Sequence, residues 1–98
     1  MLLHLGKDTV IPLKEVIAII DKESAFKSET TKRFFDKAYE QGIIENVTDE
    51  VKTYILTDKI INKKDIGKQT RKSIIYTSNI SSTTLKKRAG FVDEIISI

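Results

Sequence analysis

The sequence predicts a single α+β domain with a small, mostly antiparallel sheet, one main helix and a short C-terminal helix. Its 98 residues, 40% of them hydrophobic, are enough for one compact core and too few for a second domain. Short runs rich in β-branched residues recur along the chain and indicate strands, whereas two stretches have the capping residues and spacing of helices. Because a core of this size is modest, we expect partner subunits to add to its stability.

Two apolar runs near the N-terminus predict a hairpin. Residues 2–5 and 9–11 flank Gly6-Lys7-Asp8, which suits a tight turn, and Pro12 ends the second run. The five apolar residues at 16–20 form a short, β-branched stretch, which favours a strand covered on both faces. A short helix opened by Pro12 is the alternative.

The main helix is predicted over residues 29–41. Ser28 is the expected N-cap, Glu29 suits the positive end of the helix dipole, and Gly42 stands where a left-handed residue follows a helix. Apolar side chains at helical spacing form one stripe, which we expect to lie on the sheet: Phe34, Phe35, Ala38 and Tyr39.

Further strands are predicted in the second half of the chain. Residues 43–47 indicate a short strand, and residues 53–57 and 73–77 are the stronger candidates for an antiparallel pair. A long, lysine-rich connection from Asp58 to Lys72 joins them, and connections of this length are commonly functional.

A second helix is predicted over residues 82–89. Ser81 or Ser82 caps it, Leu85 and Ala89 form its buried edge, and Gly90 interrupts it. We assign the domain to residues 1–89. The tail at 90–98 is too apolar for a free terminus, and we expect it to dock on its own domain or on a neighbour.

Charge is unevenly distributed along the chain. The formal net charge is +3, but residues 1–58 hold 8 basic and 11 acidic side chains, while residues 59–98 hold 9 basic and 3 acidic ones. A polyanionic partner should therefore meet the C-terminal half, although a solubilising surface loop explains the same lysines. The absence of cysteine excludes disulfides and thiolate metal sites. With neither a signal peptide nor an apolar span, we expect a cytoplasmic protein without membrane contact.

The sequence lacks the residue patterns typical of catalysis. The single histidine, His4, alternates with leucines in a predicted strand, which favours a solvent-facing or interface position. The paired acids Asp49-Glu50 and Asp93-Glu94 are adjacent in sequence, which suits turns or solvated surfaces. No glycine-rich phosphate loop, metal-ligand spacing or nucleophile elbow occurs. We therefore predict that the protein is not an enzyme and uses no cofactor or metal.

The second helix has features that suit phosphate binding. Its start offers free backbone N–H groups, the positive end of its dipole and the hydroxyl groups of Ser81, Ser82 and Thr83. An ordinary capped helix with solvated lysines is the alternative. The lysines between residues 59 and 72 add cations of the kind that make salt-sensitive contacts with a nucleic-acid backbone.

Specific motifs stand at both ends of the chain and near its centre. They are His4-Leu5-Gly6, Val10-Ile11-Pro12, residues 16–21, Lys52-Thr53-Tyr54-Ile55-Leu56-Thr57, Ile75-Tyr76 and Ser78-Asn79-Ile80-Ser81-Ser82-Thr83-Thr84-Leu85-Lys86-Lys87-Arg88. In combination they resemble the RemA/RemB regulators of extracellular-matrix (biofilm) genes, and RemB more closely. The resemblance covers about residues 1–89 and has a variable middle.

The resemblance implies a small bacterial cytoplasmic regulator with a fold similar to LytTR DNA-binding domains. It also implies a ring-like homo-oligomer, and RemA members bind DNA through basic residues repeated around such an assembly. A ring multiplies weak phosphate contacts, which suits a subunit of charge +3. The candidates for DNA backbone contacts are Lys14, Lys63, Lys64, Lys68, Arg71, Lys72, Lys86, Lys87 and Arg88, with helix-cap contacts from Ser81, Ser82 and Thr83.

The sequence departs from the RemA pattern at two places and from the RemB-like pattern at one. Lys14-Glu15 stands where RemA has an arginine ahead of its apolar strand, and Asp49-Glu50 stands where RemA has adjacent arginines. Asn79 replaces a proline common in RemB-like sequences, and both residues suit a turn. Asp49-Glu50 and the apolar tail favour an alternative function: a protein-interaction or scaffold subunit that oligomerises without DNA, alone or with a RemA-like partner.

Overall fold

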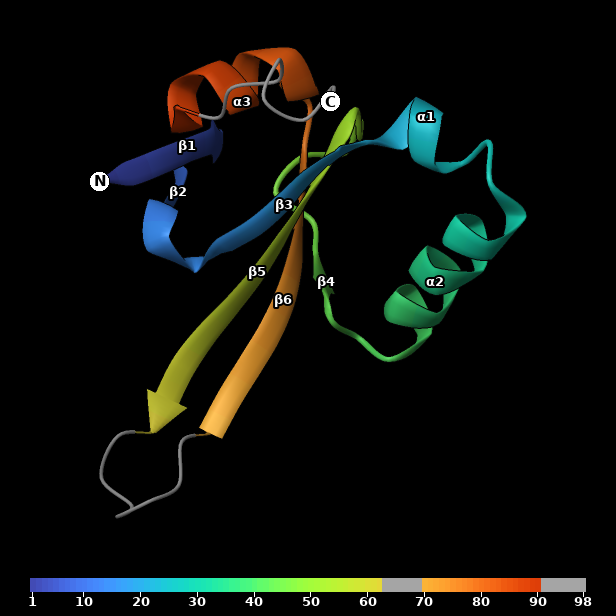
Figure 1. Ribbon diagram of the computed structural model, residues 1–98, viewed down its shortest axis with the longest axis horizontal. Helices are drawn as coiled ribbons and strands as arrows, with labels where there is room; N and C mark the ends of the chain where they lie inside the picture. The colour runs from blue at the N-terminus through green and yellow to red at the C-terminus, as the bar shows by residue number, and fades with distance from the viewer. Residues whose placement is uncertain (63–69, 91–98) are drawn as a thin grey trace, which may run out of the picture.

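The computed structural model describes residues 1–62 and 70–90 of the chain (Figure 1). Its elements are β1 (Leu2–Gly6), β2 (Thr9–Pro12), the 3-10 helix η1 (Leu13–Glu15), β3 (Val16–Asp21), α1 (Lys22–Ala25), α2 (Glu29–Glu40), β4 (Ile44–Glu45), β5 (Thr53–Asn62), β6 (Thr70–Ser78) and α3 (Ser82–Ala89). The predicted α+β class, with one main helix and a short C-terminal helix, is confirmed. The likeness to LytTR domains stays a prediction.

Four strands form the central sheet in the order β3-β5-β6-β4, and β1 pairs with β2 in a separate two-stranded sheet. The β3–β5 and β5–β6 pairs are antiparallel, whereas β4 runs parallel to β6. The sheet is therefore mostly antiparallel, as predicted. The short strand expected within 43–47 is present as two residues at one edge.

The N-terminal hairpin forms as predicted. Leu3 lies opposite Ile11, and both are buried against the central sheet, while His4 lies opposite Val10 on the outer, exposed face. The turn requires positive φ angles at Gly6 (125°) and Lys7 (47°). Glycine adopts the first of these at little cost because it lacks a Cβ.

The apolar run at 16–20 is a strand, and the helical alternative is limited to the single turn of η1 after Pro12. The prediction that both faces of this strand are covered is wrong at Ile17, which is 62% exposed. β3 is an edge strand, and its pairing with β5 shifts register between Val16 and Ala18. A bulge of this kind moves the extra residue out of the regular ladder, so Ile17 faces solvent.

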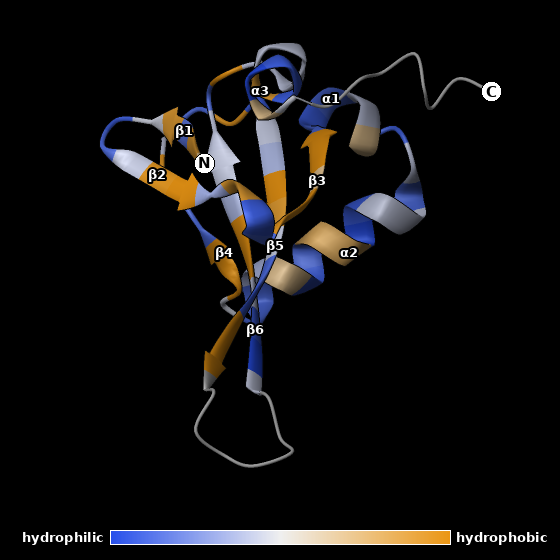
Figure 2. Ribbon diagram, turned by 60° about the vertical axis from the view of Figure 1, so that its left-hand side comes forward, coloured by the Kyte–Doolittle hydropathy of each residue, from blue (hydrophilic) through white to orange (hydrophobic). Residues whose placement is uncertain are grey.

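Opposite faces of the central sheet carry two separate apolar clusters. One lies beneath the N-terminal hairpin and α3 and includes Leu5, Ile55 and Leu85. The other lies beneath α1 and α2, where the ring of Phe35 stacks on Tyr54 with centroids 4.2 Å apart. Figure 2 shows largely hydrophobic colours on the sheet strands, between helices whose ribbons alternate between hydrophilic and hydrophobic.

The main helix, α2, begins and ends close to the predicted residues. The Oγ of Ser28 accepts a hydrogen bond from the backbone N–H of Thr31 at 3.3 Å, and Gly42 has a φ of 73°. Of the predicted stripe, only Phe35 and Ala38 are buried. The other two members, Phe34 and Tyr39, are exposed, so the face that packs on the sheet is narrower than predicted.

The predicted connection from Asp58 to Lys72 is wrong in its bounds. β5 continues to Asn62 and β6 begins at Thr70, so all of the described part of this segment is strand. The β-branched residues Ile60, Ile61 and Thr70 favour extended backbone, and cross-strand pairing prolongs the hairpin beyond the sheet. Residues 63–69 and the tail at 91–98, whose docking was predicted, lie outside the described residues.

Candidate nucleic-acid interface

The N-terminal motif His4-Leu5-Gly6 and the C-terminal motif at residues 78–88, here called the terminal motifs, lie side by side and are joined by a hydrogen bond. Ser78, fully buried at the end of β6, donates a hydrogen bond from its Oγ to the carbonyl of Leu5 at 2.6 Å and accepts one from the N–H of Ile80 at 3.0 Å. A Cβ at Gly6 would come within 3.4 Å of both Asn79 and Thr48. Leu5, Gly6, Ser78 and Asn79 therefore form a junction, here called the motif junction, which fixes the start of α3 relative to β1.

Ser81 is the residue that caps α3, which decides between the two predicted serines. Its Oγ accepts a hydrogen bond from the N–H of Thr84 at 3.3 Å and donates one to the Thr84 hydroxyl at 2.9 Å. These bonds give Ser81 a structural role. A phosphate would accept a hydrogen bond from the Ser81 hydroxyl only if it replaced Thr84 as the acceptor. The first-turn N–H groups of Ser82 and Thr83 precede the intrahelical hydrogen-bond ladder and point toward the same end.

The three basic residues of α3 differ in their surroundings. Leu85 and Ala89 are buried, as predicted, which leaves Lys87 and Arg88 exposed to solvent. Lys86 is half-buried and close to Asp21. Hydrogen bonds from Ser24 hold the pKa of Asp21 below its ordinary value, and the charges of Lys27 and Lys86 lower it further. Lys87 and Arg88 are therefore the more accessible cations of this helix.

A second basic group lies on the long hairpin of β5 and β6. Lys72 stands directly opposite Lys59 in the strand register. The guanidinium of Arg71 pairs with the carboxylate of Asp58 at 2.6 Å. Lys59 was not among the candidate contacts, although its alternation with Thr57 in a β-branched run signals a continued strand. The candidates Lys63, Lys64 and Lys68 lie outside the described residues.

The two basic groups are separated within one subunit. Figure 1 shows α3 at one end of β6 and the free end of the hairpin at the other. The six residue steps from Lys72 to Ser78 correspond to about 20 Å of strand. Lys14, the remaining candidate, is exposed in η1. A single subunit therefore offers small, separate cationic groups.

Acidic residues border the motif junction. Asp49 and Glu50 are exposed and follow Thr48, whose hydroxyl donates to the carbonyl of Glu50 at 2.9 Å. Thr48 also lies against Gly6, so this acidic loop is fixed beside the terminal motifs. Its charge opposes an approaching phosphate there.

Outside these groups the structure adds little that resembles a reaction centre. His4 is exposed, and its Nε2 lies 2.8 Å from the carbonyl oxygen of Lys7. Within 1–62 and 70–90, no three histidine, aspartate or glutamate side chains gather into a cation site. Within the same ranges, no helix has the length and apolarity to span a bilayer.

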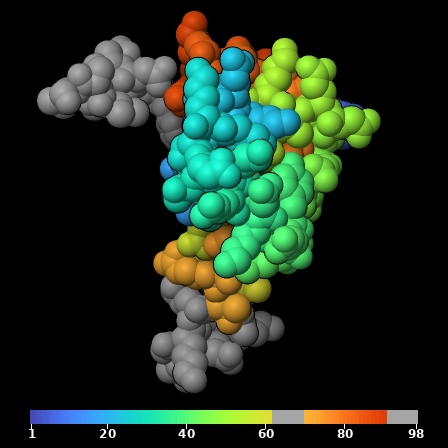
Figure 3. All heavy atoms as spheres, turned by 90° about the vertical axis from the view of Figure 1, so that its right-hand side faces the viewer, coloured from blue at the N-terminus to red at the C-terminus, as the bar shows by residue number. Residues whose placement is uncertain are grey.

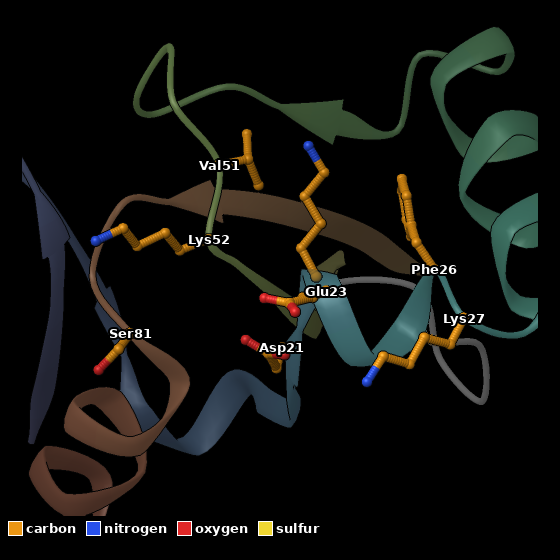
Figure 4. Close-up of a pocket in the computed structure, with 8 residues that line it drawn as sticks. Asp21, Glu23, Phe26, Lys27, Val51, Lys52 and Ser81 are labelled. Carbon is orange, nitrogen blue, oxygen red and sulfur yellow. The ribbon is translucent and has the colours of Figure 1, made fainter.

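An open cavity of about 500 Å³ lies beside α1. Figure 4 shows Asp21 and Glu23 near its centre, with Phe26 and Lys27 on one side and Lys52 and Ser81 on the other. Lysines and acids both line the cavity, and their charges oppose one another. It therefore lacks the single sign of charge that would select an anion or a cation.

A comparison against protein families covers both terminal motifs. A model of extracellular matrix regulatory protein A-like proteins, the RemA-like family, matches residues 2–89. This chain belongs to the RemA-like family. The match includes both strands of the long hairpin and all of α3, so both basic groups belong to the RemA-like region. A search of curated proteins gives no match to the chain. The closer similarity to RemB stays a prediction.

Proposed function

We propose that this RemA-like protein is a cytoplasmic, non-enzymatic regulator of extracellular-matrix genes that assembles into a ring-like homo-oligomer and binds the DNA backbone. The family match over residues 2–89 carries the proposal, because the family is a regulatory one. The missing catalytic residue sets noted in the sequence agree with a binding role.

Exposed cations support the DNA-binding part of the proposal. Lys72, Lys87 and Arg88 are exposed, and each phosphate that such a residue neutralises releases counterions and contributes about −0.9 to the slope of log affinity against log salt. A few such contacts in one subunit give weak binding. An assembly repeats them on a common scaffold, which raises the effective concentration of every contact after the first.

Exposed apolar side chains support self-association. Leu2 and Val10 stand on the outer face of the N-terminal hairpin and are 66% and 50% exposed. Ile17 on the edge strand β3 is also exposed. Covering apolar surface of this kind with a second subunit removes it from water and stabilises the assembly.

Fluorescence anisotropy with a labelled duplex across a salt series tests the proposal. We expect the affinity to fall steeply with salt and the variant Lys87→Glu/Arg88→Glu to bind much more weakly than the wild type. Lys86 is left unchanged because it lies close to Asp21. The control Lys32→Glu/Arg33→Glu changes the charge equally on exposed positions of α2. Equal binding by both variants would contradict a role for α3.

The exposed acids Asp49 and Glu50 favour a second candidate function, a scaffold subunit that assembles without DNA, alone or with a RemA-like partner. Size-exclusion chromatography with light scattering separates the two functions. A DNA-binding regulator shows an oligomer that gains mass when duplex is added. A scaffold shows the same oligomer with or without duplex, even at low salt.

A further inference from the structure

The β5–β6 hairpin extends well beyond the rest of the sheet. The pairing of β3 with β5 stops at Thr57, and the pairing of β4 with β6 involves only Ile75 and Tyr76. Residues 58–62 and 70–73 therefore form a two-stranded arm that has no neighbouring strand on either edge among the described residues. In Figure 3 the orange residues of β6 lie below α2, and Arg71, Lys72 and Ser73 border an open hollow whose other side is residues 42–45.

We propose that this arm is a β-ribbon that enters the major groove of double-stranded DNA. The inference rests on the proposed DNA binding and adds the element that makes the contact and the groove that receives it. Paired strands lie about 4.8 Å apart, and the major groove, about 12 Å wide, admits a two-stranded ribbon with its side chains. Five residues of β5 give the arm a length of about 16 Å, and the groove is about 8.5 Å deep.

The charges on the arm point to an anionic partner. Lys59 and Lys72 are direct cross-strand partners, which places two ammonium groups on the same face. Within the described part of the chain, the side chain of neither lysine forms an ion pair or a hydrogen bond. Like charges in this position destabilise a sheet. A phosphate backbone beside this face would offset the repulsion, whereas a neutral or basic partner would not.

The opposite face of the arm is braced by an ion pair. Arg71 is diagonal to Asp58 across the strands, and the pair at 2.6 Å joins β5 to β6 beyond the last strand neighbour. An isolated two-stranded ribbon is marginally stable, so a cross-strand tie helps to keep the arm extended.

Protection of free strand edges is the simpler explanation of lysines in such an arm, because charged residues discourage edge-to-edge aggregation. That role needs a charge on each edge but not at the same register position, where the two charges repel. The direct opposition of Lys59 and Lys72 is therefore better explained by a shared anionic partner.

The first test compares two charge-matched variants in the full chain. Lys59→Gln/Lys72→Gln removes the cross-strand pair, and Lys32→Gln/Lys37→Gln removes two exposed lysines from α2. We expect the arm variant to lose about 60-fold in affinity for a 30-base-pair duplex at 0.1 M salt, and about 1.8 units of salt slope, for each contacting subunit. The control should stay within about twofold of the wild type. Circular dichroism and light scattering verify that both variants keep their fold and assembly.

The second test identifies the groove. A duplex that contains glucosylated 5-hydroxymethylcytosine has sugars in its major groove and an unmodified minor groove. We expect the wild type to bind it at least tenfold more weakly than the plain duplex. The arm variant should bind both duplexes equally. An arm-dependent affinity that the sugars leave unchanged would overturn the assignment to the major groove.

Two further outcomes distinguish failure of the arm from failure of the proposed function. If the arm variant binds DNA as tightly as the wild type, the arm is not the contact, and DNA binding itself stands. If the wild type binds no duplex at low salt, the DNA-binding function fails, and the assignment of the arm falls with it.

Discussion

The hydroxyl group of Ser78 holds the two ends of the domain together, and Ser78→Ala should destabilise the fold strongly. Ser78 is fully buried and uses its Oγ twice, as donor to Leu5 and as acceptor from Ile80. Alanine fits the same space but leaves both backbone groups without this partner. Because Leu5 is also fully buried, water cannot easily replace the missing donor.

The expected loss of stability follows from the two hydrogen bonds. An unsatisfied buried polar group costs about 1–3 kcal/mol, so we expect the free energy of unfolding to fall by about 2–4 kcal/mol. A domain of this length has a total of about 5–15 kcal/mol. At about 4–8 °C per kcal/mol, the melting temperature should fall by about 8–32 °C.

Urea denaturation measures this loss. The midpoint should fall while the dependence on urea concentration stays the same, because the surface exposed on unfolding is nearly unchanged. Ser73→Ala, at an exposed position of the same strand, is the control and should change stability by less than about 0.5 kcal/mol. A loss below about 1 kcal/mol for Ser78→Ala would show that the junction is not held by this hydroxyl.

Two further predictions concern the backbone and pH. Gly42→Ala should destabilise the fold by about 1 kcal/mol, because φ is 73° and the added Cβ would meet no atom within 4 Å beyond its chain neighbours. Gly6→Ala should destabilise it by about 3 kcal/mol, because φ is 125° and the added Cβ would lie 3.4 Å from two side chains. Thermal melts compare the two variants. Asp21 has a lowered pKa when folded, so its stabilising contribution is present above its ordinary value of 3.8 and is lost as pH falls below it. Asp21→Asn should therefore flatten the dependence of the urea midpoint on pH between about pH 5 and pH 2, and an unchanged dependence would contradict the assignment.

Local sequence signals predicted the caps and the order of elements because short-range geometry decides them. Ser28 and Gly42 mark the two ends of α2. The Ser28 side-chain oxygen accepts a hydrogen bond from an N–H of the first turn, and Gly42 adopts the left-handed conformation after the last turn. The run at 16–20 was correctly assigned to a strand by its β-branched residues. The exposure of Ile17 was missed because it depends on a register shift against β5, a long-range pairing that a local run does not encode.

In the candidate site, too, local spacing predicted some features and long-range contacts decided the others. The exposed positions of Lys87 and Arg88 follow from helical spacing relative to Leu85 and Ala89, and sequence alone supplied them. The junction of Ser78 with Leu5 joins residues 73 positions apart, and no local pattern announces such a contact. The length of the arm was missed because a lysine-rich stretch resembles a surface loop when its cross-strand partners are not considered.

The arrangement of the sheet bears on the proposed binding of DNA by a subunit of modest charge. β6 carries the arm at one end and leads through the motif junction to α3 at the other, so one strand fixes the separation of the two basic groups. A net charge of +3 spread evenly would attract DNA weakly. In the proposed assembly the same charge, concentrated at fixed points and repeated in each subunit, would make several phosphate contacts without ordering the chain further at each one. This advantage depends on a rigid motif junction. The contributions of Ser78 and Gly6 to the stability of the domain are therefore linked to the proposed function.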